Sequence, residues 1–506
     1  MEDKTEPRHE FAHRSDLDVG RTLFGGFSWR GTAELVRQVG SALTLLLIAY
    51  LVGPVAFGIV GMTDVFLQFL NVFIQIGFDA AVIQRERLDT KVLSSLFWIN
   101  IGMGLVLAGI CAVAAPQLSR FYHEPQLTSV ATFLSASFVL QSLSVVQRGL
   151  LNRQMAFRTL AIIDILATIL SSVLAVVVAW IDGSYWSLVV LQLTKLSVLA
   201  VGLWVASPWR PGFVIDIRNS LDSLRFSGNI LIFNTLNFFA TRLDVILIGR
   251  ILGAEELGFY LLANRLVFTP LGQILNVLEG ILLPILSAVQ ERIERVREIY
   301  LTAILSVFKS VAPLLVATIL IAPIAIQLRI AEEWAPIVPI FIVWSIGGMR
   351  RIMTSRLGVL YLVMKRPDLQ WKFQLISTPV VATAILMGVR WGALGVAITF
   401  NVAQLLTSLI SMYLALGLVG MGIGSYLWQY RYAVVALSFQ YFLGYFLAKF
   451  ALGWLMSPYI TGVLVVFSSF TAYVLLMLTL DSQFVRVLTA GHTMLRRMWQ
   501  DRPVSI

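Results

Sequence analysis

The sequence predicts an all-α polytopic membrane protein with about fourteen transmembrane helices, and three observations predict it. Only 13% of the 506 residues are charged, against roughly 25% in a typical soluble domain. The hydrophobic share of 58% can supply roughly 14 spans at about 20 residues each. Lys and Arg are concentrated on every second connecting segment and on both terminal tails, which indicates an even number of spans. A soluble fold is excluded, because it would leave several apolar runs of span length without polar residues to cover them.

Gly, Pro and charged residues divide the chain into apolar segments, and each segment of span length is predicted to form one helix. The first seven predicted spans cover residues 29–52, 55–79, 93–116, 126–147, 159–180, 184–206 and 226–249. The second seven cover residues 256–284, 299–324, 335–359, 373–389, 392–417, 432–450 and 458–480. Residues 1–28 are polar and carry both signs of charge, so we expect no cleavable signal peptide and insertion from the first span.

The distribution of Lys and Arg predicts the orientation of these spans. Of the 38 basic residues, 28 lie on the N-terminal tail with the start of the first span, on even-numbered loops or on the C-terminal tail. Five lie on odd-numbered loops, and five lie within spans. By the positive-inside rule both termini are therefore cytoplasmic. The sorting explains the net charge of +10 as topology, so no nucleic-acid partner is expected.

What the sequence lacks excludes several chemistries. The single cysteine, Cys111, can form neither a disulfide framework nor a cysteine-ligated metal site. The four histidines lie outside the apolar runs, so no histidine proton relay is expected within the membrane. The chain has no G-x-x-x-x-G-K-S/T phosphate loop for ATP hydrolysis. We predict a protein that is not an enzyme and has no cofactor, driven by an ion gradient, by the substrate gradient or by a partner.

An internal repeat relates the two halves of the chain. Residues 51–58 resemble residues 251–258 at a shift of 200, and Leu70-Asn71-Val72 recurs as Leu275-Asn276-Val277 at a shift of 205. The matches are six spans apart, so the two copies have the same orientation in the membrane. Parallel repeats are one layout of secondary transporters, with the substrate path between the halves. Chance recurrence of a Gly-rich turn is the alternative explanation.

Ionisable residues lie well within the predicted spans. They are Glu34, Arg37, Asp64, Asp164, Lys195, Arg242, Asp244, Arg265, Glu279 and Lys309. Each costs about 2.5–3.5 kcal/mol at the bilayer centre, so they must face one another or water. Asp164 and Lys309 are close enough to the cytoplasmic side to pair with a loop charge or to extend toward the interface. Two interpretations remain for the others: buried pairs that fix helix register, or the lining of a hydrated cavity.

Helical spacing arranges several of these charges on common faces. Arg30, Glu34 and Arg37 are four and three residues apart, which makes a ladder of opposite charges on one face of the first span. Arg265 and Glu279 lie only about 40° apart around the eighth span and about 21 Å apart along it. One face of that helix is therefore expected to carry a base near the outer side and an acid near the inner side.

The charges as a set favour a cationic cavity. Lys195 lies near mid-depth in the sixth span, and Arg242 and Asp244 point in nearly opposite directions on the seventh. Guanidinium and ammonium groups suit an anionic substrate such as a phosphate or pyrophosphate. The candidate substrate-binding residues are Arg30, Arg37, Lys195, Arg242 and Arg265. The candidate ion-coupling residues are Glu34, Asp64, Asp244 and Glu279, and no metal site is predicted.

Several stretches resemble the bacterial polysaccharide transporters, which are the lipid-linked oligosaccharide flippases of the multidrug/oligosaccharidyl-lipid/polysaccharide exporter superfamily. The stretches are residues 150–158 (LLNRQMAFR) with Asp164, 185–189 (YWSLV), 243–266 and 283–287 (LPILS) with Gln290 and Arg295. The resemblance covers the first twelve spans and is strongest from about residue 145 to 300. Spans 13 and 14 match only in being apolar.

The resemblance implies two six-helix lobes around a central cavity, plus two C-terminal helices, working by alternating access. The expected division is a cytoplasmic tail 1–28, an N-lobe 29–215, a C-lobe 216–425, spans 13 and 14 in 426–480, and a cytoplasmic tail 481–506. The implied substrate is an undecaprenyl-diphosphate-linked repeat unit, moved between the leaflets of the bacterial inner membrane for exopolysaccharide, capsule or O-antigen synthesis. Membrane lipid, a polymerase and a chain-length regulator of the same pathway are the expected partners.

Two other functions compete with this one. An integral-membrane polymerase or ligase of the same pathway is expected to need a sizeable periplasmic loop with catalytic acids or bases, whereas all odd-numbered loops here are short. A drug or metabolite antiporter of the same superfamily would change drug resistance on deletion and leave polymer synthesis intact. The stretch from about 150 to 300 favours the glycan transporters.

Overall fold

The computed structural model describes residues 37–74 except 39, and then 90–213, 227–327, 332–453, 457–481 and 484. Within these ranges the chain contains helices and no strand, and eleven segments are long and apolar enough to cross a membrane. One of the eleven, Pro367–Gly417, covers two predicted spans, and the shorter helix Gly40–Val52 covers the described part of the first. The predicted fold class, an all-helical polytopic membrane protein, is confirmed.

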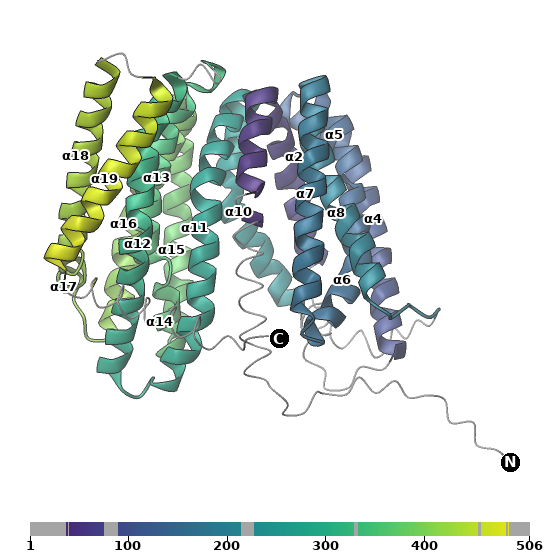
Figure 1. Cartoon of the computed structure of the whole chain (residues 1–506). Coiled ribbons are helices and arrows are strands. Elements are labelled where there is room, and N and C mark those ends of the chain that lie inside the picture. The colour runs from purple at the N-terminus through teal and green to yellow at the C-terminus, as the bar shows by residue number, and fades with distance from the viewer. Residues whose placement is uncertain are drawn as a thin grey trace, which may run out of the picture.

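The helices form two groups that meet along three central helices (Figure 1). The first group contains α4 (Thr90–Tyr122), α5 (Gln126–Leu134), α6 (Ala136–Arg153), α7 (Phe157–Asp182) and α8 (Trp186–Ala206). The central helices are α2 (Pro54–Ile74), α10 (Ser227–Ile251) and α11 (Ala254–Ala288). The second group contains α12 (Ile293–Gln327), α13 (Ile337–Thr354), α14 (Leu357–Val363), α15 (Pro367–Gly388), α16 (Gly392–Gly417), α17 (Ile423–Trp428), α18 (Arg431–Gly453) and α19 (Pro458–Leu480).

Some predicted spans differ from the observed helices in their limits. The predicted span 126–147 lies within one segment of membrane-crossing length, Gln126–Arg153, in which α5 and α6 are separated at Ser135, and the span 335–359 overlaps the segment Ile337–Val363, which is divided between α13 and α14. The span predicted to end at residue 116 continues to Tyr122 with Pro116 inside the helix. Hydropathy indicates where a segment becomes polar, but a helix can continue into polar residues because its backbone hydrogen bonds continue. The predicted boundary between 215 and 216 lies outside the described residues.

The repeated sequence motif forms the crossing between α2 and α11. A Cβ atom at Gly58 would overlap the carbonyl oxygen of Ala254, and one at Gly258 would overlap the carbonyl oxygen of Pro54. At the shift of 200, Gly58 corresponds to Gly258 and Pro54 corresponds to Ala254. The contact of Gly58 with Ala254 is therefore equivalent to the contact of Gly258 with Pro54. Only glycine permits two helix backbones to approach this closely. The repeat therefore joins the two halves of the molecule through equivalent contacts.

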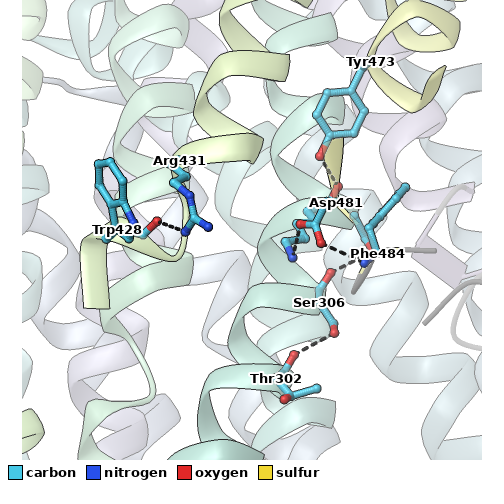
Figure 2. A network of polar contacts seen from close by, with 9 residues as sticks. Thr302, Ser306, Trp428, Arg431, Tyr473, Asp481 and Phe484 are labelled. Atoms are coloured by element: carbon cyan, nitrogen blue, oxygen red, sulfur yellow. Dashed lines mark hydrogen bonds and ion pairs between the residues drawn. The ribbon is translucent and has the colours of Figure 1, made fainter. Parts of the chain in front are cut away.

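Helices α18 and α19 are fixed to α12 by polar contacts at a proline. Pro313 has no N–H, so the carbonyl of Lys309 lacks its usual helical donor, and the Tyr473 hydroxyl donates to it at 2.8 Å. Gln440, which is fully buried, donates to the Pro313 carbonyl at 2.9 Å. Lys309 Nζ lies 2.6 Å from Asp481 Oδ2, at the end of α19. Figure 2 shows Tyr473 and Asp481 next to the helix that carries Thr302 and Ser306, which is α12.

Candidate functional site

A cavity of about 490 Å³ lies where α11 meets helices of the N-terminal half. Its volume is within the range of about 300–1,000 Å³ that is usual for small-molecule sites. The helix Gly40–Val52 with the two residues Arg37 and Gln38 before it, α2, α7, α8 and α11 all contribute to its lining. Its polar lining residues are Arg37, Gln38, Ser41, Thr44, Asp64, Thr168, Ser171, Ser172, Gln192, Lys195, Arg265, Thr269 and Gln273.

Four of the charged residues singled out in the sequence meet in this cavity. Arg37, Asp64, Lys195 and Arg265 come from four different helical segments and all contribute to the lining. Arg265 Nη2 donates to Asp64 Oδ2 at 2.9 Å, which links α11 to α2 across the two halves of the chain. A guanidinium has five N–H donors, so this contact leaves Arg265 with donors for a further anion. Among the described residues the lining therefore contains three bases and one acid.

Helical spacing brings the cavity residues of α11 and α8 to one side. Arg265, Thr269 and Gln273 follow one another at intervals of four and line the same wall. On α8, Gln192 and Lys195 are three residues apart and also face the cavity. Two helices from different halves of the chain thus present polar stripes to the same space.

The other predicted residues lie elsewhere. Asp244 is buried on α10 and accepts a hydrogen bond from the Tyr260 hydroxyl at 2.6 Å, while Arg242 is near enough to interact electrostatically with both Asp64 and Asp244. Neither α10 residue lines the cavity. Glu279 pairs with Arg356 further along α11. Arg30 and Glu34 lie outside the described residues, so the proposed ladder of the first span is described only at Arg37.

The two charges expected to pair near the cytoplasmic side do pair. Asp164 Oδ1 lies 2.6 Å from Arg148 Nη2, and Lys309 bonds Asp481. The predicted span ends at residue 147, so Arg148 was expected on the following loop, whereas it lies inside α6. Lys309 is buried, and of the two alternatives expected for it the pairing is the one observed. Among the described residues, no group of three His, Cys, Asp or Glu side chains is placed to hold a metal ion.

Sequence reasoning missed the uncharged polar residues of the cavity. The hydroxyl groups of Thr44 and Ser172 are hydrogen-bonded at 2.7 Å, which links the first helix to α7 beside the cavity. Thr168 donates to the carbonyl of Asp164 at 2.8 Å. Hydroxyl groups that bond to their own helix cost little in a membrane, so these residues do not stand out in a hydropathy profile. Their helical spacing from Lys195 and Arg265 is the signal that could have identified Gln192, Thr269 and Gln273.

Trp334 packs against the N-terminal parts of α2 and α11. Trp334 is buried there, and its indole N–H donates to the Ala49 carbonyl at 2.9 Å. Its ring meets the rings of Phe57 at 5.6 Å and Phe259 at 5.8 Å between centroids. Trp334 follows α12 in the chain and Ala49 precedes α2, so the contact joins the two halves beside the glycine crossing.

Comparisons with known proteins agree with this architecture. A sequence profile described as polysaccharide biosynthesis protein matches residues 47–339. The teichuronic acid biosynthesis protein TuaB of Bacillus subtilis is 26% identical over 361 residues, covering 71% of this chain and 75% of that protein. The lipopolysaccharide biosynthesis protein WzxC of Escherichia coli is 24% identical over 435 residues, covering 84% and 86%. A structure of the lipid II flippase MurJ in an inward closed conformation superposes with a TM-score of 0.63 at 14% identity, covering 87% and 97%.

Proposed function

Because the chain belongs to the polysaccharide biosynthesis protein family, we propose that it is a flippase for undecaprenyl-diphosphate-linked oligosaccharide repeat units. It carries them from the cytoplasmic to the periplasmic leaflet of the bacterial inner membrane, with both of its own termini in the cytoplasm. The fold similarity to a lipid II flippase supports a transporter architecture, and the relatives named for teichuronic acid and lipopolysaccharide synthesis support a glycan pathway.

The composition of the cavity carries the proposal. Arg37, Lys195 and Arg265 line a membrane-embedded space in which Asp64 is the acidic lining residue among those described. Guanidinium groups bind phosphate oxygens through paired N–H donors, and an ammonium adds a point charge. The surrounding Ser, Thr and Gln side chains offer donors and acceptors that match the hydroxyl groups of a sugar. The diphosphate and glycan occupy this cavity while the polyprenyl chain remains in lipid.

Asp64 is the coupling residue that the geometry favours. It bonds Arg265 across the two halves at 2.9 Å and lines the cavity, whereas Asp244 bonds Tyr260 and Glu279 bonds Arg356 outside it. Binding of H+ or Na+ to Asp64 weakens its hold on Arg265 and releases the guanidinium for the substrate. A coupling ion can shift the balance between conformations only by binding them unequally. Asp64 meets that condition if the α2–α11 contact opens during transport.

Short connections on the predicted outer side support a transporter over a polymerase or ligase. The described helices α4 and α5 are separated by residues 123–125, and α10 and α11 by residues 252–253. The helices α15 and α16 are joined by the short helix Val389–Trp391. Such connections offer little room for a periplasmic catalytic domain.

The test is a deletion strain complemented with Arg265→Gln. We expect the variant to make about tenfold less polymer and to accumulate the lipid-linked repeat unit in the cytoplasmic leaflet, because a hydrogen bond to a charged group is lost. Arg295→Gln is the matched control, since Arg295 pairs with Glu298 at 2.7 Å on an exposed surface. Normal polymer in the deletion strain, or normal polymer without precursor accumulation in Arg265→Gln at wild-type protein level, contradicts the proposal. Altered drug resistance with intact polymer would instead favour an antiporter.

A further inference from the structure

A group of arginines near the junction of α13 and α14 lies outside the cavity. Arg350, Arg351 and Arg356 fall within seven residues, and topology alone would assign them to the cytoplasmic end of the span. Glu279 of α11 is the only carboxylate within salt-bridge distance of any of them in the described part of the chain, and it pairs with Arg356. Arg350 and Arg351 therefore have no carboxylate partner in that part of the chain.

The ion pair of Arg356 is asymmetric. The Arg356 side chain is 13% exposed and the Glu279 side chain is 42% exposed. Arg356 Nη2 also donates to Asn276 Oδ1 at 3.1 Å, and its Nε is buried without a hydrogen-bond partner among the described residues. The base is thus fixed while the acid is open to solvent. An incoming anion can replace the carboxylate without moving the arginine.

Arg351 has no carboxylate partner among the described residues and lies on an aromatic ring. Its guanidinium carbon is 5.0 Å from the centre of the Phe268 ring of α11. A ring face orients a guanidinium but does not neutralise it. Phe268 is not among the cavity-lining residues, and it lies about one turn after Arg265 on α11.

Helical geometry connects these arginines to Arg265. Asn276, which accepts from Arg356, is 11 residues after Arg265, which is about 20° around α11 and about 16 Å along it. Gln273 lines the cavity one turn before Asn276. The α11 residues that Arg351 and Arg356 contact, Phe268 and Asn276, therefore both lie within about 60° of Arg265 around the helix, on the way from its predicted cytoplasmic end to the cavity.

We propose that Arg351 and Arg356 form a second phosphate-binding subsite, where the diphosphate of the substrate binds before it reaches Arg265. The inference rests on the proposed flippase function and adds to it a path of access from the cytoplasmic leaflet. Glu279 acts as the counter-ion of the empty subsite and is displaced by the diphosphate. Bulk phospholipid carries the same phosphate chemistry, so the experiment must separate the two sources.

The test measures binding of undecaprenyl diphosphate to the full-length protein in nanodiscs of neutral lipid. Arg351→Gln and Arg356→Gln should each weaken binding about five- to tenfold, because each removes a charge-assisted contact. Glu279→Gln should strengthen binding about two- to fivefold, since the partly exposed carboxylate no longer competes for Arg356. A gain of affinity cannot come from misfolding. Arg295→Gln should bind like the wild type.

The outcomes separate this inference from the proposed function. If Arg265→Gln weakens binding while Arg351→Gln and Arg356→Gln bind like the wild type, the second subsite is wrong and the flippase stands. If the wild-type protein does not bind undecaprenyl diphosphate, the proposed function itself fails. If phosphatidylglycerol at equal mole fraction displaces undecaprenyl diphosphate completely, the arginines take bulk lipid head groups and the inference is overturned.

Discussion

Two acid–base pairs inside the helical region have the same chemistry and different surroundings. Lys309 and Asp481 lie 2.6 Å apart with side chains 5% and 8% exposed, between α12 and the end of α19 (Figure 2). Arg265 and Asp64 lie 2.9 Å apart with side chains 42% and 15% exposed, and both line the cavity. Each pair joins segments that are distant in the sequence.

The difference in exposure decides what each pair can do. A buried charge without its partner is very unfavourable, so Lys309 and Asp481 hold each other in place. A pair beside a hydrated cavity can exchange a partner for water, an ion or a substrate group at small cost. We therefore expect the first pair to contribute to stability and the second to transport.

The largest expected effect comes from breaking the buried pair. Lys309→Met should lower the free energy of unfolding by about 3–5 kcal/mol, because the buried Asp481 carboxylate loses the opposite charge of the ammonium. Thermal unfolding of the purified protein in detergent measures it. The double variant Lys309→Met with Asp481→Leu should recover most of the loss, since both charges are removed together. A single variant as stable as the wild type would show that water reaches Asp481.

The second expected effect is on transport and not on folding. Asp64→Asn should change the free energy of unfolding by less than about 1 kcal/mol, because the pair is partly exposed. Flipping of a fluorescent undecaprenyl-diphosphate oligosaccharide in proteoliposomes should lose its dependence on the H+ or Na+ gradient. Asp164→Asn is the matched control, since Asp164 also pairs with an arginine and lies outside the cavity. Gradient-dependent flipping by Asp64→Asn would remove Asp64 from the coupling step.

The sequence predicted these two pairs unequally. The charged residues within the predicted spans, such as Arg265, Asp64 and Lys309, can be identified from hydropathy alone, because each charge is costly in an apolar segment. The partner of Lys309 lies 172 residues further along the chain, in a region predicted as cytoplasmic tail, and only tertiary packing brings it there. Tertiary packing also brings the hydroxyl groups of different helices together in the cavity, and hydropathy does not mark them.

Arg356 shows a second reason why the sequence is insufficient. Its charge is accounted for by the positive-inside rule, so topology analysis gives no reason to ask what it contacts. The break between α13 and α14 places it near Glu279 and Asn276, and that break lies inside one predicted span, 335–359. Helix existence could be predicted from composition, whereas helix breaks depend on contacts between helices.

A smaller effect should follow from removing the hydroxyl beside the buried pair. Tyr473→Phe leaves the Lys309 carbonyl without a donor at the position where Pro313 already removes one. We expect a loss of about 1–2 kcal/mol in the free energy of unfolding, typical of an unsatisfied buried acceptor. Thermal unfolding compared with Tyr445→Phe, an exposed residue of α18, provides the control. Equal stability of the two variants would mean that the carbonyl finds another donor.

The smallest expected effect comes from a hydroxyl group in the wall of the cavity. Ser172→Ala removes the Ser172 hydroxyl from its 2.7 Å hydrogen bond with Thr44, which joins the first helix to α7. Thr44 also donates to the Gly40 carbonyl at 2.7 Å, so its hydroxyl keeps a partner in the variant. The free energy of unfolding should therefore fall by only about 0.5 kcal/mol. Because Ser172 lines the cavity, flipping of the fluorescent oligosaccharide should show a raised half-saturating concentration at unchanged maximal rate. A loss of stability as large as that of Lys309→Met would mean that the cavity wall is as rigid as the α12–α19 contact, and the distinction between a structural and a transport pair would fail.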